Sequence, residues 1–179
     1  VSVIGHFNEW SPGLHPLTPR WDKSGIWEGF IPGFGLGEAY KYHITGFEGR
    51  ETQKGDPLAH FWEKRPHTAS ITWDLYYEWQ DQNWMQNRHR HNSLDAPWSV
   101  YEVHLASWQR PVPGDEESYN SYDQLAERLV PYVKKMGFTH VEFMPVMEHP
   151  FDGSWGYQCT GFFAPTSRFG DPQGLMRLI

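Results

Sequence analysis

The residues best suited to chemistry lie in one glycine-punctuated segment, residues 147–170. It carries the polar and aromatic side chains Asp152, Trp155, Tyr157 and Gln158. Aromatic rings either fill protein cores or stack their flat faces on sugar rings and bases, and carboxylates accept hydrogen bonds from hydroxyl groups. A long loop that directly follows a strand is more often functional than a short connector. We therefore expect a binding site in this segment.

Other reactive groups form no recognised catalytic pattern. The chain has ten histidines, but His140 and His149 only bracket a strand and no pair has metal-ligand spacing. Cys159 is the single cysteine and has no evident activating base. Glu142 and Glu148 lie on or just after a strand; Glu142 could be buried there with a partner, and neither is assigned a catalytic role. The sequence therefore predicts no metal and no cofactor.

Composition narrows the possible partners. The net charge is −7 and basic residues are scattered, which argues against nucleic acid, and the short basic run at residues 88–91 fits a solvated linker. No run of about 18 apolar residues predicts a membrane span, and no signal peptide is visible. A lone cysteine suits a reducing compartment, so a cytoplasmic location is expected. The oligomeric state is not predicted.

A small β-sandwich is expected at residues 1–72. Short apolar runs alternate there with Gly and Pro turns, such as the turn at residues 11–13, and no segment shows a helical stripe. Strands are predicted at residues 1–4, 26–31, 39–44 and 68–71, with a hairpin turn at 47–50. Residues 73–96 are mostly polar and are predicted to be a linker.

From residue 97 onward the pattern becomes strand, helix, strand. Strands are predicted at residues 98–105 and 138–146, and they should be parallel with a right-handed crossover. Between them Ser121 and Gln124 have capping-box spacing. A helical stripe follows, made of Leu125, Leu129 and Val133.

Two residues are expected to shape the end of this helix. Pro131 should kink it or end it early, since proline removes a backbone hydrogen bond and crowds the preceding turn. Gly137 should be its C-terminal stop. The chain is expected to end at Ile179 inside a second helix.

Two motifs carry a resemblance to known proteins. Gly-His-Phe-Asn-Glu-Trp at residues 5–10, with Gly-Ile-Trp-Glu, Tyr-Lys-Tyr and Asp-Pro later in the chain, resembles the carbohydrate-binding module of branching enzymes, debranching enzymes and glycogen-sensing kinase subunits. Residues 148–158 and 160–170 resemble the loop after the second barrel strand of branching enzymes in the α-amylase superfamily. Tyr-Glu-Val-His at residues 101–104 resembles the first barrel strand.

The resemblance implies a fold and an activity. It implies an immunoglobulin-like β-sandwich module at residues 1–72, the linker at 73–96, and the first βαβ part of a truncated (β/α)8 TIM barrel at 97–179. The parent protein is expected to be a glycogen (1,4-α-glucan) branching enzyme. Such an enzyme cuts an α-1,4 glucan with retention and transfers the cut chain to form α-1,6 branches.

The resemblance places the catalytic carboxylates beyond Ile179, so residues 1–179 alone should be inactive. Two other classes of protein remain open. One is a non-catalytic glucan-binding protein, which the predicted β-sandwich fits about equally well. The other is a different α-amylase relative, such as a debranching enzyme or a trehalose-releasing hydrolase.

The resemblance also assigns roles to the candidate loop residues. Tyr157 matches a tyrosine that lies under the sugar at the cleavage point; the alternative is a tyrosine packed in an irregular loop. Trp155 and Gln158 either contact glucan or support the loop. Asp152 either accepts hydrogen bonds from sugar hydroxyls or caps a turn, and the Asp-Gly pair favours the turn.

In the N-terminal module, Trp10 and Lys41 match positions that hold glucan in related modules. The alternative for Trp10 is burial between sheet and loop. The second tryptophan that related modules often carry has no counterpart at residues 47–52. Its absence weighs against tight glucan binding by this module.

Overall fold

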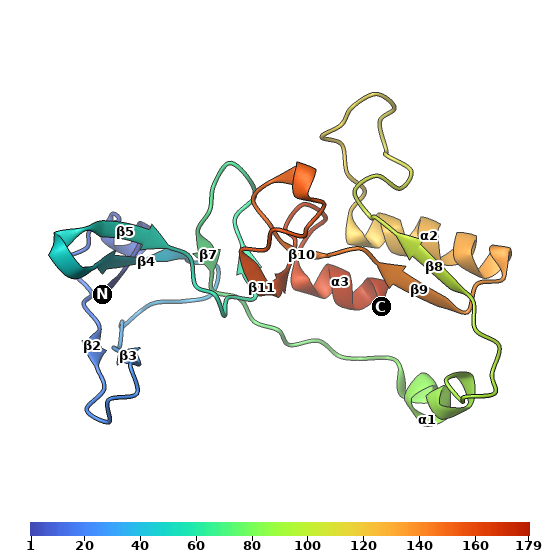
Figure 1. The fold of residues 1–179 in the computed structure, drawn as a ribbon, viewed down its shortest axis with the longest axis horizontal. Helices are drawn as coiled ribbons and strands as arrows, with labels where there is room; N and C mark the ends of the chain where they lie inside the picture. The colour runs from blue at the N-terminus through green and yellow to red at the C-terminus, as the bar shows by residue number, and fades with distance from the viewer. The chain divides into compact units, whose positions relative to one another are not determined.

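The computed structural model describes residues 1–179, and these residues divide into two compact units (Figure 1). The first unit contains Val1–Asp74 together with Met147–Ser167. The second unit contains Leu75–Val146 together with Arg168–Ile179. The segment with the candidate loop residues therefore folds with the N-terminal segment Val1–Asp74, although a stretch of the second unit precedes it in the chain.

The first unit is built on an antiparallel sheet of five strands. These are β1 (Ser2–Gly5), β4 (Ala39–Thr45), β5 (Glu51–Lys54), β6 (Phe61–Trp62) and β7 (Ser70–Ile71). The central strand is β4, which pairs with β1 along one edge and with both β5 and β7 along the other. Alternation along β4 places Tyr40 and Tyr42 on one face and Lys41 and His43 on the other.

Smaller elements complete the first unit. The strands β2 (Thr18–Pro19) and β3 (Trp27–Glu28) form a separate antiparallel pair. Three short 3-10 turns occur at η1 (His6–Asn8), η2 (Phe47–Gly49) and η3 (Asp152–Ser154). The strand expected at residues 26–31 is shorter than predicted, because Gly29 and Pro32 interrupt the extended pairing.

The segment expected to be one long loop contains a strand pair. The strands β10 (Met147–Glu148) and β11 (Gly161–Pro165) pair antiparallel, and β11 also lies against β6 (Figure 1). The buried side chains Ala59, Trp62 and Ala164 form a core cluster there. The loop that carries Tyr157 is therefore the connection between β10 and β11.

The second unit confirms the predicted strand, helix, strand pattern. The strands β8 (Val100–Val103) and β9 (His140–Phe143) are parallel, with α2 (Tyr122–Met136) between them in sequence. The helix α3 (Pro172–Leu178) follows at the end of the chain. Residues predicted to be a linker contain a polar helix, α1 (Gln82–His91). Its lack of an apolar stripe explains why the sequence pattern did not indicate it.

The helix α2 begins as predicted. The backbone N–H of Gln124 donates to Ser121 Oγ at 3.2 Å, and the Ser121 N–H donates back to Gln124 Oε1 at 2.9 Å. The predicted stripe is buried in a core cluster with Val103 and Tyr122.

The end of α2 agrees with one prediction and corrects another. Gly137 ends the helix with a φ of 82°, as expected. The early break predicted at Pro131 was wrong, because the helix runs on to Met136. Burial of Leu129 and Val133 on either side offsets the single lost backbone hydrogen bond.

Glu142, for which burial with a partner was considered, is exposed. It lies on β9, opposite Glu102 in the parallel pair.

None of the helices is both long enough and apolar enough to cross a membrane.

Candidate functional site

The loop between β10 and β11 is shaped by successive local hydrogen bonds. Ser154 Oγ donates to the Phe151 carbonyl at 2.7 Å, and the Trp155 N–H donates to the Asp152 carbonyl at 2.9 Å. The Tyr157 N–H then donates to the Ser154 carbonyl at 3.0 Å. Trp155 and Gly156 both have positive φ, so the chain reverses direction there. The position of Tyr157 is therefore set by a chain of contacts that begins at Phe151 and Asp152.

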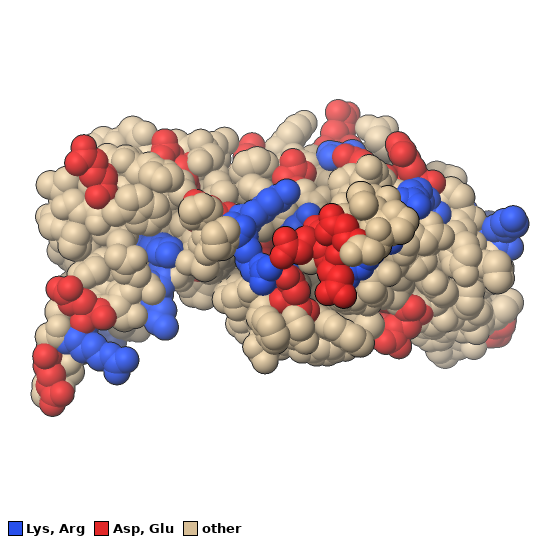
Figure 2. All heavy atoms as spheres, turned by 90° about the horizontal axis from the view of Figure 1, so that it is seen from above, with Lys and Arg blue, Asp and Glu red and all other residues tan.

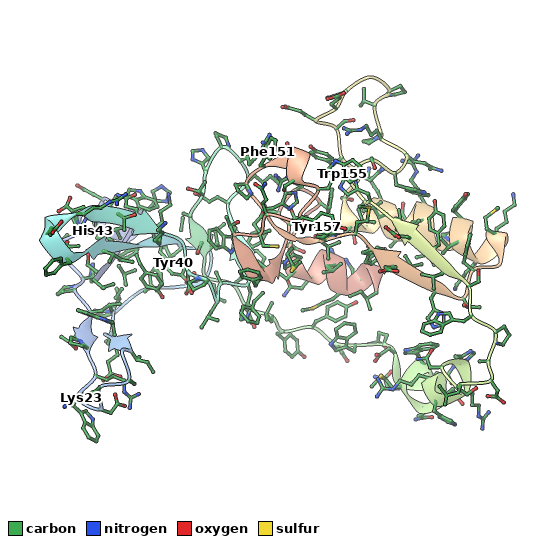
Figure 3. The ribbon with its side chains drawn as sticks, in the orientation of Figure 1. Lys23, Tyr40, His43, Phe151, Trp155 and Tyr157 are labelled. Atoms are coloured by element: carbon green, nitrogen blue, oxygen red, sulfur yellow. The ribbon has the colours of Figure 1, made fainter.

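Large aromatic side chains on this loop face outward. Tyr157 is 67% exposed and Trp155 is 54% exposed, and Gln158 beside them is also exposed. Figure 3 shows Phe151, Trp155 and Tyr157 on the same connection. The loop thus presents flat apolar faces on which a sugar ring can stack.

Asp152, the fourth candidate of the loop, is already engaged. Its carboxylate forms an ion pair with Arg65, with Nη2 and Oδ2 2.8 Å apart. Arg65 was not predicted as a site residue, because it is far from Asp152 in sequence and no local pattern links the two. The side chain of Asp152 therefore ties the candidate loop to the segment that follows β6.

A buried carboxylate closes the base of the same loop. Glu148 is 5% exposed and accepts hydrogen bonds from the N–H groups of His149 at 3.0 Å and Ser167 at 2.6 Å. Thr166 Oγ1 also donates to it, at 3.4 Å. These bonds satisfy the buried carboxylate and join the two ends of the segment. They give Glu148 a structural role at the base of the loop.

A second candidate site is a surface hollow on the first unit. It has a volume of about 600 Å³ and contains both residues predicted for glucan binding, Trp10 and Lys41. Its other lining residues are His6, Gln53, Glu63, Pro66, His67 and Thr68. The ammonium of Lys41 donates to Thr68 Oγ1 at 2.8 Å, and the rings of His6 and Trp10 meet edge to face at 5.3 Å. The structure thus brings the two predicted residues to one concave surface.

The Gly-His-Phe-Asn-Glu-Trp motif shapes one wall of this hollow. The Asn8 side chain is buried; its Nδ2 donates to the Val3 carbonyl and its Oδ1 accepts from the Gly5 N–H, both at 2.9 Å. The Trp10 N–H donates to the Gly5 carbonyl at 2.8 Å. A Cβ at Gly5 would collide with the Ala39 carbonyl. Gly5 and Asn8 therefore hold the turn that presents Trp10.

The residues that the sequence analysis missed in the hollow come from separate strands and loops. Gln53 of β5 is opposite His43 of β4, and therefore shares the face that Lys41 occupies. His6 lies inside the recognised motif, so its position was available from the sequence. Glu63, His67 and Thr68 come from the segment between β6 and β7, whose approach to Lys41 no local pattern shows.

The opposite face of β4 contains a partly buried polar cluster. The hydroxyls of Tyr40 and Tyr42 donate to Asp56 Oδ2 at 2.7 and 3.2 Å. The Leu58 N–H donates to Asp56 Oδ1 at 2.8 Å, and the Asp56 N–H donates to Ser70 Oγ at 2.8 Å. Burial and the Asp56 carboxylate raise the pKa of Tyr42 to about 12, and they raise the pKa of Tyr40 further. The Asp-Pro part of the motif therefore fixes the sheet behind the hollow.

Charge and metal-ligand groups point to no other centre. On the face shown in Figure 2, Lys and Arg side chains lie beside Asp and Glu and form no continuous basic stripe. No group of three or more His, Cys, Asp or Glu side chains is arranged to hold a metal ion.

Comparisons with known proteins agree with both motifs. Residues 1–59 match the family model of carbohydrate-binding module 48, the isoamylase N-terminal domain. The chain is 55% identical, over its full 179 residues, to the 1,4-α-glucan branching enzyme GlgB of Aquifex aeolicus (strain VF5). The alignment covers 28% of that protein. The identity to GlgB of Desulfitobacterium hafniense (strain Y51) is 50% over 180 residues, again covering 28% of the relative.

A solved structure supports the fold. A Salmonella typhimurium protein, assigned provisionally as an α-amylase, aligns with a TM-score of 0.65 and 22% identity. The alignment covers 91% of this chain and 24% of that one, and at this identity it bears on the fold alone. This chain thus spans just over a quarter of the length of the two GlgB relatives. The resemblance predicted from the two motifs is confirmed along the whole sequence: the chain is related to part of the 1,4-α-glucan branching enzymes.

Proposed function

We propose that these residues are the glucan-holding part of an enzyme that cleaves an α-1,4 glucan and transfers the cut chain to a 6-hydroxyl, forming an α-1,6 branch. The observation that carries the proposal is the match of all 179 residues, at 55% identity, to a protein named as a branching enzyme. The exposed Tyr157 loop supports it, because it presents aromatic faces suited to a sugar.

Within this proposal, the two candidate sites divide the work of holding glucan. Tyr157 lies under the sugar at the cleavage point, where its ring stacks on the sugar and stabilises positive charge that develops as the bond breaks. Trp155 and Gln158 contact the same chain. In the hollow, Trp10 stacks on a pyranose while Lys41 donates to its hydroxyls, which holds another stretch of glucan.

The bond-making chemistry is assigned to other residues of the whole protein. Retention through a covalent glycosyl-enzyme needs a nucleophile and an acid/base, two carboxyl groups about 5 Å apart. Asp152 is paired with Arg65, and Glu148 is buried under backbone donors. Neither is free for these roles, and the proposal places the catalytic carboxylates beyond Ile179.

The proposed fold follows the same relationship. The five-stranded sheet would be part of an immunoglobulin-like β-sandwich at residues 1–72, and the parallel pair β8–β9 with α2 would begin a (β/α)8 barrel at residues 97–179. Residues 73–96 would connect them. A cytoplasmic location is proposed because Cys159 is the only cysteine and suits a reducing compartment.

The direct test compares the full-length protein with residues 1–179 on amylose. The full-length protein should lower the iodine absorbance and create α-1,6 linkages, and residues 1–179 should do neither. Branching by residues 1–179 alone would contradict the assignment of the carboxylates. Hydrolysis of the α-1,6 linkages of glycogen, without new branches in amylose, would point instead to a debranching relative, and release of trehalose from a trehalosyl-ended glucan would point to a trehalose-releasing relative.

A second candidate function is glucan binding without catalysis. The hollow with Trp10 and Lys41, together with the match of residues 1–59 to a carbohydrate-binding module, favours it. The same assay separates the two functions. A purely binding protein would be retained on glycogen and would leave the linkage pattern of amylose unchanged.

A further inference from the structure

Residues 62–65 contact the Tyr157 loop and the chain that follows it at three separate points. Arg65 pairs with Asp152 at the start of η3, and Trp62 lies against Gly161 at the start of β11. The Glu63 carbonyl accepts from Ser167 Oγ at 3.4 Å. These contacts fall before and after Tyr157 in the chain. The position of the loop therefore depends on a short stretch of the N-terminal module.

The Trp62 contact fixes the end of the loop. The Trp62 side chain is 6% exposed and shares its core cluster with Ala59 and Ala164. A Cβ at Gly161 would come within 2.5 Å of the indole Nε1, so only glycine allows this close approach. The strand β11 is thus held tightly, whereas the part of the loop that carries Tyr157 lies several residues before it.

The Arg65 contact acts at the other end, closer to Tyr157. Asp152 is the first residue of η3, and its carbonyl accepts from the Trp155 N–H at 2.9 Å. Ser154, in the same turn, accepts from the Tyr157 N–H at 3.0 Å. A displacement of Asp152 would therefore move Trp155 through the first of these hydrogen bonds, and it would move Tyr157 through the second, which starts from the same turn. The ion pair with Arg65 links this part of the loop to the segment that follows β6.

We infer that Arg65 is a positioning residue for the Tyr157 loop: through its ion pair with Asp152, the N-terminal module sets where the Tyr157 ring lies. The inference rests on the proposed function for its consequence in catalysis, but the anchoring itself does not. Arg65 touches no substrate in this scheme. Its ion pair engages the carboxylate of Asp152, so that Asp152 supports the turn. Contact with the sugar is then made by the neighbouring rings.

The ion pair sets the size of the expected effect. The side chains of Arg65 and Asp152 are 42% and 35% exposed, so the pair contributes modestly to stability. A small displacement of a ring under the reacting sugar can nevertheless lower the rate strongly. We expect Arg65→Ala to lower kcat about three- to tenfold, with a smaller change in KM, while the protein remains folded.

The experiment uses the full-length protein that contains this chain, with amylose as substrate and two readouts. One is kcat and KM for branching; the other is amide hydrogen exchange in residues 151–160. The variants are Arg65→Ala, Arg65→Lys, Arg65→Asp, Asp152→Arg and the charge-exchanged double variant. Lys64→Ala is the matched control, because Lys64 is an exposed basic neighbour of Arg65.

The expected result differs among the variants. Exchange in residues 151–160 rises and kcat falls in Arg65→Ala, Arg65→Asp and Asp152→Arg. Arg65→Lys shows a smaller loss, Lys64→Ala shows none, and the charge-exchanged double variant recovers both readouts. Recovery by reversed charges is what a general loss of stability would not produce.

Two results would overturn the inference. One is unchanged exchange in Arg65→Ala; the other is a double variant no better than its single variants. If the unaltered protein does not branch amylose, the proposed function fails, while the exchange data still decide whether Arg65 anchors the loop. If it branches amylose and Arg65→Ala keeps full kcat, the expected consequence for catalysis is wrong, the proposed function stands, and the exchange data again decide the anchoring.

Discussion

The hollow and the Tyr157 loop belong to the same compact unit, but they hold their aromatic side chains in different ways. In the hollow, Lys41 is already bonded to Thr68, and Trp10 sits partly buried against His6. On the loop, the rings of Trp155 and Tyr157 are more than half exposed. The hollow is thus fixed by its neighbours, while the loop depends on its own turns and on Arg65.

This difference separates two contributions to glucan binding. Groups that are already ordered lose little conformational entropy on binding, so the hollow is suited to holding a chain. Exposed rings gain most from being covered, so the loop is suited to a contact that forms when the sugar is in place. If the two contributions are separate, a substitution in one region should leave the function of the other unchanged.

Asp56→Ala should remove the support behind the hollow. It deletes the acceptor for the Tyr40 and Tyr42 hydroxyls and leaves both without this partner in a largely buried site. The free energy of unfolding should fall by about 3 kcal/mol, measured by urea denaturation. Asp56→Asn keeps one acceptor oxygen and should lose less. Equal stability of Asp56→Ala and the unaltered protein would show that the cluster does not hold the sheet.

Tyr157→Ala should act on catalysis and leave the hollow intact. Burying an aromatic face is worth about 2 kcal/mol, which corresponds to a rate loss of roughly tenfold to a hundredfold in the full-length protein. Retention on glycogen should change little, because the hollow remains. Tyr157→Phe keeps the ring and serves as the matched variant. A full rate in Tyr157→Ala would remove this ring from the proposed site.

Replacing both Trp10 and Lys41 by alanine should weaken glycogen binding and leave the rate unchanged, the reverse of the effect expected for Tyr157→Ala. Retention on glycogen, measured by affinity electrophoresis, should weaken about tenfold, while kcat at saturating amylose stays near its original value. Trp21→Ala is the control, since Trp21 is 88% exposed and lies outside the hollow. Equal weakening by Trp21→Ala would mean that exposed tryptophans in general, and not the hollow, retain the glucan.

Alkaline pH should destabilise the sheet behind the hollow. The pKa of Tyr42 is raised from 10.0 to about 12 in the folded protein, so the unfolded chain loses its proton first as pH rises. The stability from this group is therefore fully present below about pH 10 and falls between about pH 10 and 12. Urea denaturation at a series of pH values checks this. Tyr42→Phe should make the decline less steep, and Tyr40, whose pKa is raised in the same direction, should account for the remainder. A decline of the same slope in Tyr42→Phe would assign it to other groups.

The sequence predicted the elements whose stabilising contacts are local. The helix α2 followed from its capping box and its buried stripe, and the parallel pair β8–β9 followed from the order of strand, helix and strand. Both depend on residues close in sequence or on a fixed rule of connection. Of the two outcomes expected at Pro131, the early end of the helix was wrong, because burial of the neighbouring stripe outweighed a local backbone preference.

The candidate sites were only partly predictable, for a related reason. Trp10 and Lys41 could be named from their motifs, but their meeting in one hollow depends on the β4–β5 register and on residues 63–68. The pairing of Met147 with Pro165, and of Arg65 with Asp152, joins distant parts of the chain. Such contacts leave no periodic signal in the sequence.

The Trp62 ring has a consequence for hybrid proteins. It lies between two glycines, Gly55 and Gly161, each of which would collide with it if it carried a Cβ. Gly55 is in the N-terminal module, and Gly161 is the first residue of β11, directly after the Tyr157 loop. Exchanging residues 1–74 for another module would leave Gly161 facing a different side chain, and a smaller one would open a void beneath β11. A graft that retains the loop should therefore also retain Gly55, Trp62 and Arg65.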